Sequence, residues 1–577
     1  MSPAIDGTSM KILGLNFTSH NAAAVLISNH GILAAAEEER FDRRKHSSNF
    51  PVGAINYCLQ ESGAQVDDLD AVAFFVNPRI FYRLYNISEG FPKSVRLLPY
   101  VLKQIRDSSN MRRAFSDFAA GHNKPPAFFI DHHLAHAASC FFVSPFTNAA
   151  ILTLDGRGEY ETLCIFHGRG NRIEKRLSVA FPHSIGILYE TITRYLGFSP
   201  RDEFKVMGLA SYGTKRLVKE FQKVAWIDQK GQLKLNLKYF DHYFRYGRQA
   251  RGFTSALEEE FGQARQPDDP VTEHHADIAY AVQQLTEDLV MPFVQRARAI
   301  TGEADLCMAG GVALNCVANR KVIESGVFQN IFVQPAANDA GTSLGAALSV
   351  YFNLHPGAPR FRMENVYLGP AFTDKQIQAC LEKYHGITVE KTADPARTAA
   401  ELIHAGAIVG WFQGRMEFGP RALGCRSILA APVHAETKDI INAKIKFREE
   451  FRPFAPAVIA GHEQDYFQTS PAGENLYAYM LASVQALPEA IPMIPAVVHV
   501  DGTSRIQVVL RETNPLYWQV IQEYARLSNI YVILNTSFNV KGEPIVCTPE
   551  DAIHTYLNSG LDYVVMGSYL ISKIACK

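Results

Sequence analysis

The stretch Phe129-Ile-Asp-His-His-Leu-Ala-His-Ala-Ala-Ser139 is the part of the chain that best indicates its fold. If residues 131–140 form a helix, His132 and His136 stand four positions apart on one helix face. The alanines at positions 135, 137 and 138 favour a helix and leave room beside it. Two imidazoles at this spacing can bind one divalent metal ion, although a pair of satisfied histidines on a half-buried helix is the commoner meaning of such a pattern.

Two further stretches each place an aspartate after an apolar strand. Leu154-Asp155-Gly156 follows the apolar residues 149–153, and Asn338-Asp339-Ala340-Gly341 follows residues 331–334. An aspartate at the carboxyl tip of a strand, next to glycine, is where an α/β fold places metal and phosphate ligands. Both stretches therefore favour the metal interpretation of the two histidines.

A pattern of strand, loop, strand, turn and strand occurs twice. The first set of strands is predicted at 11–16, 22–27 and 32–36, with the loop 17–21 after its first strand. The second set is predicted at 149–155, 162–166 and from Arg172 onwards. Two such units predict an internally duplicated domain. Sugar kinases, actin and Hsp70 share that architecture and offer a loop of each hairpin to phosphate, which is an analogy of fold alone.

A pair of glycines lies where a predicted strand, residues 305–309, meets a helix beginning near Ala313. Glycines at such a junction let the backbone approach a ligand closely, and the helix N-terminus favours an anion. On its own, Gly310-Gly311 is more typical of a tight turn.

The length of 577 residues predicts two or three domains. We expect a disordered lead at 1–10, a duplicated α/β domain at 11–352, a Pro- and Gly-rich linker at 353–366, and a second α/β domain at 367–577. Helices are predicted at 52–63, 185–196 and 276–300 in the first domain, and at 374–384, 395–405 and 437–447 in the second. Strands of the second domain are predicted at 408–412 and 531–534.

Composition excludes several classes of partner. The net charge of −1 does not favour nucleic acid or an anionic membrane, and no apolar run reaches 18 residues. The first ten residues do not have the pattern of a signal peptide. The nine cysteines are scattered without a Cys-x-x-Cys pair, which suits a reducing cytoplasm. We therefore expect a cytoplasmic protein that binds neither nucleic acid nor membrane.

Cations crowd the second domain. Between positions 419 and 452 the sequence places Arg421, Arg426, Lys444, Lys446, Arg448 and Arg452, and Arg505 follows later. Phenylalanines at 447, 451 and 454 are interleaved with them, so we expect this segment to be partly buried. Buried cations need anionic partners, and rigid turns that present guanidinium groups suit a polyanion. The acidic run Glu37, Glu38, Glu39 and Arg40 is instead interpreted as a solvated strand end.

Seven motifs together resemble the NodU/CmcH family of O-carbamoyltransferases, whose best-known members carbamoylate antibiotics and nodulation factors. The resemblance covers the chain from about Lys11 to its end. Its motifs are Glu37-Glu-Glu-Arg-Phe41, His132-His-Leu-Ala-His136, Lys205-Val-Met-Gly-Leu-Ala-Ser-Tyr-Gly213, Gly310-Gly-Val-Ala-Leu-Asn315, Gly419-Pro-Arg-Ala-Leu-Gly424, Arg452-Pro-Phe-Ala-Pro456 and Asn535-Thr-Ser-Phe-Asn539.

The resemblance implies a metal site in the first domain, which is similar to the TsaD family. That family transfers threonylcarbamoyl to tRNA and holds iron or zinc. By position, the ligands implied here are His132, His136, Asp155 and Asp339, binding Fe²⁺ or Zn²⁺. The residues implied for nucleotide binding are Lys205, Gly310, Gly311 and Asn315. His20, in the loop after the first strand, is our choice of base for an acceptor hydroxyl, the alternative being a histidine exposed to water.

The second domain is similar to the YrdC family. The resemblance implies that this domain condenses carbamoyl phosphate with ATP. We expect Mg²⁺ as well, because ATP is usually bound as its magnesium complex. The residues implied to bind the phosphates and the carbamoyl group are Arg421, Lys446, Arg452 and Arg505. Asn535 and Ser537 are implied to line the nucleotide pocket. Positioning and charge neutralisation are the catalytic contributions expected of this site, with Lys446 and Arg421 as catalytic residues.

The function implied is an O-carbamoyltransferase that makes carbamoyladenylate and modifies a hydroxyl of a secondary metabolite, as in antibiotic biosynthesis and other natural-product tailoring. One alternative is a tRNA threonylcarbamoyl enzyme, which predicts a basic surface that the net charge does not favour. Another is a non-enzymatic ATP-binding scaffold of the actin/Hsp70 type. We expect a small-molecule acceptor as partner, and a homodimer is left open. The aromatic stretches 75–100 and 239–246 are candidates for lining the pocket that binds the acceptor. Residues 83–123 are a candidate for a lid or a substrate-specific insertion.

Overall fold

The structure is a computed structural model that describes residues 10–81, 83, 91–243 and 251–574. Residues 1–9 of the predicted lead lie outside the described residues, as do parts of the predicted lid and of both aromatic stretches (82, 84–90 and 244–246). The chain divides into two compact units. The first consists of Met1–Ala34 and Ser48–Met363, and the second of Ala35–Ser47 and Glu364–Lys577.

The first unit contains two five-stranded sheets with the same strand arrangement, except that residues 35–37, at the end of one strand, belong to the second unit. One has the order β3-β2-β1-β4-β5, and the other has the order β8-β7-β6-β11-β12. In each sheet the first strand pairs antiparallel with the second and parallel with the fourth in order of the chain, β1 with β4 and β6 with β11. The strands are β1 (Lys11–Asn16), β2 (Ala23–Ser28), β3 (Gly31–Glu37), β4 (Ala71–Phe74), β5 (Ala127–Phe129), β6 (Asn148–Leu154), β7 (Glu161–Arg169), β8 (Arg172–Ala180), β11 (Asp305–Ala309) and β12 (Asn330–Val333). This repetition confirms the duplicated α/β fold of the actin/Hsp70 type.

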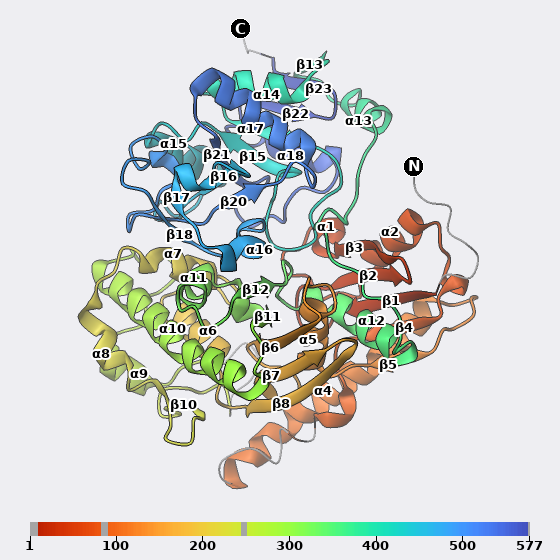
Figure 1. Ribbon diagram of the computed structural model, residues 1–577, viewed down its shortest axis with the longest axis vertical. Coiled ribbons are helices and arrows are strands. Elements are labelled where there is room, and N and C mark those ends of the chain that lie inside the picture. The colour runs from red at the N-terminus through yellow and green to blue at the C-terminus, as the bar shows by residue number, and fades with distance from the viewer. Residues whose placement is uncertain (1–9, 82, 84–90, 244–250, 575–577) are drawn as a thin grey trace. The chain divides into compact units, whose positions relative to one another are not determined.

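Two helices lie between these sheets. Helix α5 (His132–Phe141) packs against β6 and β11, and α12 (Ala340–Leu354) packs against β1 and β2 (Figure 1). The helices touch through glycine, because a Cβ atom on Gly345 would lie 1.7 Å from the carbonyl oxygen of Ala135. Helix α5 follows β5 and α12 follows β12. Their N-termini therefore stand at the carboxyl edges of the two sheets.

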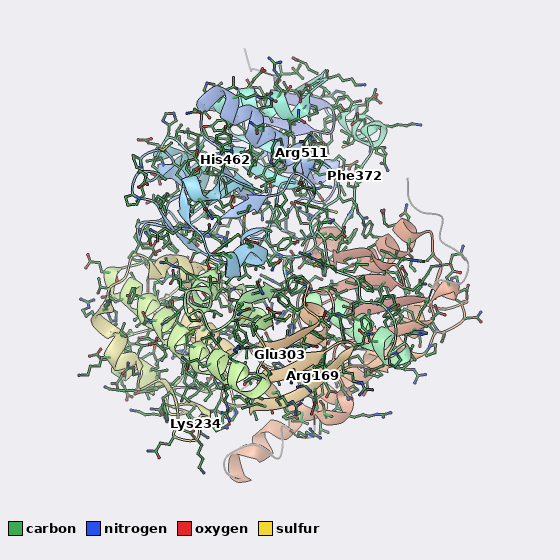
Figure 2. All side chains as sticks on the ribbon, in the orientation of Figure 1. Arg169, Lys234, Glu303, Phe372, His462 and Arg511 are labelled. Atoms are coloured by element: carbon green, nitrogen blue, oxygen red, sulfur yellow. The ribbon has the colours of Figure 1, made fainter. Side chains whose placement is uncertain are left out.

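The remaining helices of the first unit surround the sheets. They are α2 (Val52–Ser62), α4 (Phe91–Phe118), α6 (Ile185–Tyr195), α7 (Glu203–Ala210), α8 (Val218–Phe221), α9 (Ser255–Phe261), α10 (Glu273–Thr301) and α11 (Cys316–Glu324), with a small ribbon of β9 (Ala225–Ile227) and β10 (Leu233–Leu235). Figure 2 shows the side chains on these elements. Glu303 lies just after the end of α10, and its carboxylate is 2.7 Å from Nε2 of His167 on β7, to which Arg169 also donates. No helix among the described residues is both long and apolar enough to cross a membrane.

The second unit is built on an eight-stranded mixed sheet of order β13-β23-β22-β14-β15-β21-β16-β20. Its strands are β13 (Ile387–Lys391), β14 (Val409–Phe412), β15 (Arg426–Ala430), β16 (Ala455–Ile459), β20 (Gln507–Val509), β21 (Val532–Ser537), β22 (Tyr563–Met566) and β23 (Tyr569–Lys573). A smaller sheet contains β17 (Phe467–Gln468), β18 (Val484–Ala486) and β19 (Thr503–Ser504). The α/β class predicted for this part of the chain is therefore confirmed.

Helices α14 (Pro395–His404) and α17 (Pro515–Ser528) pack against each other on the large sheet, where Trp411 and Tyr517 are fully buried. The other helices are α1 (Glu39–Asp42), α13 (Asp374–Leu381), α15 (Glu436–Ile441), α16 (Glu474–Tyr477) and α18 (Pro549–Leu557). The residues predicted as a helix over 437–447 are helical up to Lys446, but they do not form one continuous α-helix. There α15 gives way to a π-helical turn, Asn442–Lys446, which ends at Phe447 in the left-handed region with φ 47°.

The interpretation of Glu37, Glu38, Glu39 and Arg40 as a solvated strand end is wrong. All four residues are buried, at no more than 6% exposure, and belong to the second unit. The physical reason is charge pairing, since Arg40 forms ion pairs with both Glu37 and Glu39. A charge run is usually solvated because isolated buried charges are costly, and this guanidinium supplies the missing partner.

Candidate functional site

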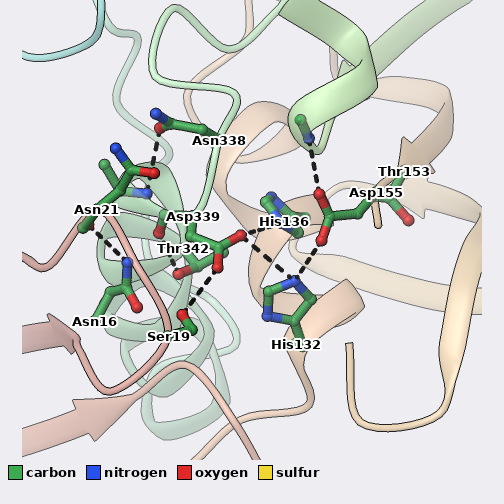
Figure 3. Close-up of polar contacts among 12 residues, drawn as sticks. Asn16, Ser19, Asn21, His132, His136, Thr153, Asp155, Asn338, Asp339 and Thr342 are labelled. Atoms are coloured by element: carbon green, nitrogen blue, oxygen red, sulfur yellow. Dashed lines mark hydrogen bonds and ion pairs between the residues drawn. The ribbon is translucent and has the colours of Figure 1, made fainter. Parts of the chain in front are cut away.

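Two histidines and two aspartates converge in the first unit (Figure 3). His132 and His136 come from the first turn and a half of α5, Asp155 directly follows β6, and Asp339 precedes α12. One ligand atom from each lies within 4.8 Å of all the others. Nε2 of His132 is 3.2 Å from Oδ2 of Asp155, and Nε2 of His136 is 3.7 Å from Oδ1 of Asp339. The structure thus brings together the four residues predicted as metal ligands.

The polar atoms of this cluster fit a bound cation. His136 is completely buried, and neither of its ring nitrogens, nor Oδ1 of Asp339, has a hydrogen-bond partner among the described residues. A buried polar group without a partner typically costs about 1–3 kcal/mol, so such groups need an explanation. A divalent ion among the four side chains would satisfy these atoms together.

The electrostatics of the cluster also favour positive charge. Burial lowers the pKa of His132, but the carboxylates of Asp155, Asp339 and Glu159 outweigh it and raise that pKa to about 9. Burial raises the pKa of Asp339, but His20, His136 and His132 outweigh it and lower the pKa to about 2. Both shifts show that the aspartates stay ionised and hold a positive charge beside them.

A buried glutamate fixes the start of helix α5. Oε1 of Glu159 accepts hydrogen bonds from the backbone N–H groups of Asn77, at 2.7 Å, and of His132, at 3.0 Å. Burial raises the pKa of Glu159 to about 7. The neighbouring His133 points elsewhere, with Nδ1 2.8 Å from the hydroxyl of Thr153, and burial lowers its pKa to about 3. Of the three histidines in the motif, His133 is therefore a structural residue.

Glycines let the loop after β6 approach α5. A Cβ atom on Gly158 would lie 3.0 Å from Cβ of His132. The backbone N–H of Gly311 donates to Oδ1 of Asp155 at 3.0 Å, and Gly310 has φ 97°. The predicted nucleotide residues Gly310 and Gly311 therefore lie beside the aspartate at the tip of β6.

The loop after β1 faces Asp339 from the other side. Its backbone is strained, since Thr18 has φ 82° and Asn21 has φ 51°, and strain of this kind concentrates at functional sites. The side chain of Asn16 holds the loop by donating to the carbonyl oxygens of His20 and Asn21. Ser19 donates to Oδ2 of Asp339 at 3.1 Å.

His20 lies at the rim of the cluster, with about a third of its side chain exposed. Its Nδ1 is 2.8 Å from Oδ1 of Asn21, and its Nε2 is 3.7 Å from Oδ2 of Asp339. An amide oxygen can only accept, so Nδ1 carries the proton and Nε2 has the lone pair in the neutral ring. The geometry is that of a base directed toward the cluster.

Two other predicted nucleotide residues already have protein partners. Lys205 on α7 forms an ion pair with Asp202 at 2.9 Å. Asn315 caps α11 by accepting from the N–H of Ala318, and its amide also pairs with Gln283. The structure thus gives Asn315 a structural role.

Lys446 lies at the centre of the predicted phosphate site in the second unit. Its ammonium is buried and donates to the carbonyl of Ser537, to the carbonyl of Asn539 at 3.0 Å and to Oδ1 of Asn539 at 2.9 Å. Burial, together with the charges of Arg448, Arg452 and Lys45, lowers its pKa well below the usual range. Such a site favours an anion that restores the balance of charge.

Arg448 belongs to the same cluster. Burial and the charges of Arg452 and Arg505 lower its pKa, with Glu449 opposing them. Its guanidinium lies 4.6 Å from the centre of the Phe454 ring and donates to the side chain of Asn442 at 2.7 Å. Arg452 lies 3.9 Å from Glu449. The charges of Arg452 and Arg505 thus both act on Arg448, and the charges of Arg448 and Arg452 act on Lys446.

The turn that carries Arg421 is held by buried polar residues. Asn535 donates to the carbonyl of Ala422 at 3.2 Å and to Gln507, which donates to the carbonyl of Leu423. Asn535 is only 1% exposed, so its contacts are those of a residue that positions the turn. Arg421 itself is half-buried.

Sequence reasoning did not select Ser19, Glu159, Arg448 or Asn539 for a site. Ser19 lies in the loop after the first strand, where the analogy with sugar kinases, actin and Hsp70 places a phosphate. Asn539 ends the motif that contains Ser537, and the hydroxyl of Ser537 donates to it at 2.7 Å. Arg448 stands two positions after Lys446 in the cation run. No sequence pattern identified Glu159, because it accepts hydrogen bonds from the backbone of Asn77 and His132, which are distant in sequence.

Comparison with known proteins identifies the family of this chain. Residues 11–348 match the family described as carbamoyltransferase N-terminus, and residues 400–573 match carbamoyltransferase C-terminus. Nodulation protein NolNO of Sinorhizobium fredii is 38% identical over 97% of this chain and 80% of that protein. An uncharacterized protein of Synechocystis is 38% identical over 98% of this chain and 97% of its own length.

The similarity to solved structures is weak. Full-length HypF in its phosphate- and nucleotide-bound form shares 13% identity over 60% of this chain and 56% of its own, with a TM-score of 0.34. The duplicated fold therefore rests on strand order, and the family on the sequence matches. With both family regions matched over most of its length, the chain belongs to the carbamoyltransferases and is a carbamoyltransferase enzyme.

Proposed function

We propose that the second unit makes carbamoyladenylate from carbamoyl phosphate and ATP, and that the first unit transfers the carbamoyl group to a hydroxyl of a small molecule. The observation that carries this proposal is the buried ammonium of Lys446 beside Arg448 and Arg452. Glu449 is the carboxylate that opposes these charges at Arg448. Two phosphate-bearing substrates would supply the missing negative charge.

The reaction proposed for the second unit joins two negatively charged substrates. Water cleaves carbamoyl phosphate to carbamate and phosphate, and a carbamate oxygen then attacks the α-phosphorus of ATP, so that pyrophosphate leaves. Mutual repulsion of the substrates opposes this approach, and fixed cations that neutralise them lower the barrier. Lys446 and Arg421 are the proposed catalytic residues, with Arg452 and Arg505 binding phosphate and Ser537 lining the site. Mg²⁺ accompanies ATP.

In the first unit, His132, His136, Asp155 and Asp339 would hold a divalent ion. Two imidazoles and two carboxylates with open positions suit Fe²⁺, with Zn²⁺ as the second choice. When bound, such an ion supplies Lewis-acid stabilisation of the phosphate that departs as AMP. Lys205, Gly310 and Gly311 are proposed to lie along the nucleotide.

His20 is proposed to take the proton of the acceptor hydroxyl. Asn21 orients the ring so that Nε2 faces the cluster, and the loop around it is held by Asn16. As the hydroxyl oxygen attacks the carbamoyl carbon, its proton passes to Nε2 and the bond to AMP breaks. General base catalysis by a positioned side chain contributes about 10²–10⁴-fold.

His20→Asn is therefore expected to separate the two half-reactions. Asparagine is polar and similar in size to histidine, but its side chain cannot accept a proton at neutral pH. The rate of carbamoyl transfer should therefore fall by about 10²–10⁴-fold. Pyrophosphate release on ATP and carbamoyl phosphate should stay near the wild-type rate. Both products can be measured in one quenched sample. Transfer at the wild-type rate would show that His20 takes no part.

The acceptor is proposed to be a hydroxylated secondary metabolite, and a relative named as a nodulation protein is consistent with a small molecule. Incubation with a panel of hydroxylated natural products, followed by mass spectrometry, tests this. We expect one product to gain the mass of a carbamoyl group only when ATP and carbamoyl phosphate are both present. Carbamoylation that proceeds without ATP would contradict the adenylate route.

A further inference from the structure

A short segment from the beginning of the chain belongs to the second unit. The chain leaves the first unit after Ala34, contributes residues 35–47 to the second unit and returns to the first at Ser48. We call residues 35–47 the strap. It contains the buried run from Glu37 to Arg40 and the short helix α1.

Arg40 joins the strap to the turn that carries Arg421. Its guanidinium donates to the carbonyl oxygen of Gly419 at 3.1 Å, across 379 positions of sequence. Two carboxylates fix the orientation of that guanidinium, since Glu37 accepts from Nη2 and Glu39 lies 2.8 Å from Nη1. A further oxygen of Glu39 accepts from the backbone of His46, so the strap also closes on itself.

Arg43 joins the strap to a second loop of the anion site. It donates to the carbonyl oxygens of Pro544 at 3.0 Å and Ile545 at 2.8 Å. This loop begins at Asn539, whose amide donates to the carbonyl of Glu543 at 2.7 Å and whose Oδ1 accepts from Lys446. Hydrogen bonds therefore connect Arg43 to this loop and the loop to the ammonium of Lys446, and the peptide bond from Glu543 to Pro544 joins the two sets.

Apolar packing connects the same two loops. Met416 and Ala422, on either side of the Gly419 turn, form a small buried cluster with Ile545 and Cys547. Phe41 of the strap packs against this cluster. The charge of Lys45, an exposed strap residue, also contributes to the lowered pKa of Lys446. The strap thus lies against both loops of the site.

We propose that the strap completes the anion site of the second unit, with Arg40 and Arg43 as positioning residues. Arg40 holds the Gly419 turn, and through it Arg421, while Arg43 holds the loop from Asn539 to Ile545 against Lys446. The adenylate-forming site would then depend on residues far removed in sequence from the rest of the second unit. This inference rests on the proposed function of that unit.

The test compares Arg43→Ala with Arg44→Ala in the full-length protein. Arg44 is the next residue of the strap, it is exposed, and its side chain makes no hydrogen bond or ion pair with the described residues. The assay is exchange of labelled pyrophosphate into ATP, driven by carbamoyl phosphate. Because small displacements of positioning groups cost up to roughly 10²-fold, we expect Arg43→Ala to raise the KM for carbamoyl phosphate and lower the exchange rate by about 10–10²-fold. Arg44→Ala should exchange like the wild type.

Arg40→Lys and Arg43→Lys are the second pair of variants. Lysine keeps the positive charge beside the carboxylates but loses the planar fork of donors, so both should remain folded and both should still lose exchange. Their melting temperatures and the metal content of the first unit should match the wild type. If the wild type does not exchange, the proposed function fails. If it does and all three variants at Arg40 and Arg43 exchange like Arg44→Ala, the strap inference is overturned.

Discussion

Replacing Lys446 by alanine is expected to abolish exchange of pyrophosphate into ATP. The ammonium is buried and donates to Ser537 and Asn539. Removal of one preorganised group that stabilises transition-state charge costs about 10²–10³-fold in rate, and we propose that this lysine also neutralises two bound anions. We therefore expect a loss of at least about 10³-fold, measured with labelled pyrophosphate at saturating carbamoyl phosphate.

Lys444→Ala provides the matched control for that variant. Lys444 lies in the same π-helical turn, but its side chain is exposed. It should retain wild-type exchange, and both variants should keep the metal of the first unit. Exchange by Lys446→Ala at the rate of Lys444→Ala would show that adenylate forms elsewhere.

His136→Ala is expected to remove the metal and stop carbamoyl transfer. His136 is fully buried, and its ring nitrogens have no hydrogen-bond partner among the described residues, which is the observation behind its proposed role as a ligand. Loss of one of four ligands should reduce the metal content, measured by elemental analysis, from about one ion per chain to a small fraction. Pyrophosphate exchange should continue, because it belongs to the second unit.

His133→Gln distinguishes loss of a ligand from general damage to helix α5. His133 neighbours His132, but it pairs with Thr153 and the backbone of Glu161. This variant should lower the melting temperature while it keeps the metal. A full metal load in His136→Ala would contradict the ligand assignment.

Local sequence patterns predicted the elements that carry the first site. The hairpins around β1 and β6 follow the alternation of strands, and the spacing of His132 and His136 follows the helical repeat. Asp155 and Asp339 were recognisable because each follows an apolar strand beside glycine. That all four meet was implied by the family resemblance, since spacing alone could not place Asp339 beside a helix 200 positions earlier.

Long-range contacts set the limit of the prediction. The burial of Glu37 and Arg40 depends on their pairing within the second unit and on Gly419, which no local pattern reveals. Asn535 is predicted to line a nucleotide pocket, and the structure adds that its amide holds the Arg421 turn. No local pattern reveals that contact, because its partner lies 113 positions earlier in the sequence. Likewise, the helical pattern over 437–447 did not reveal the π-helical turn that precedes Phe447.

The central claim is that the carbamoyl group passes through an adenylate made at the cation cluster of the second unit. Exchange of labelled pyrophosphate into ATP, in the absence of any acceptor, measures that step directly. We predict exchange by the wild-type protein that requires carbamoyl phosphate, persists in His136→Ala and disappears in Lys446→Ala. Transfer of carbamoyl to an acceptor by a protein that shows no such exchange would contradict the account.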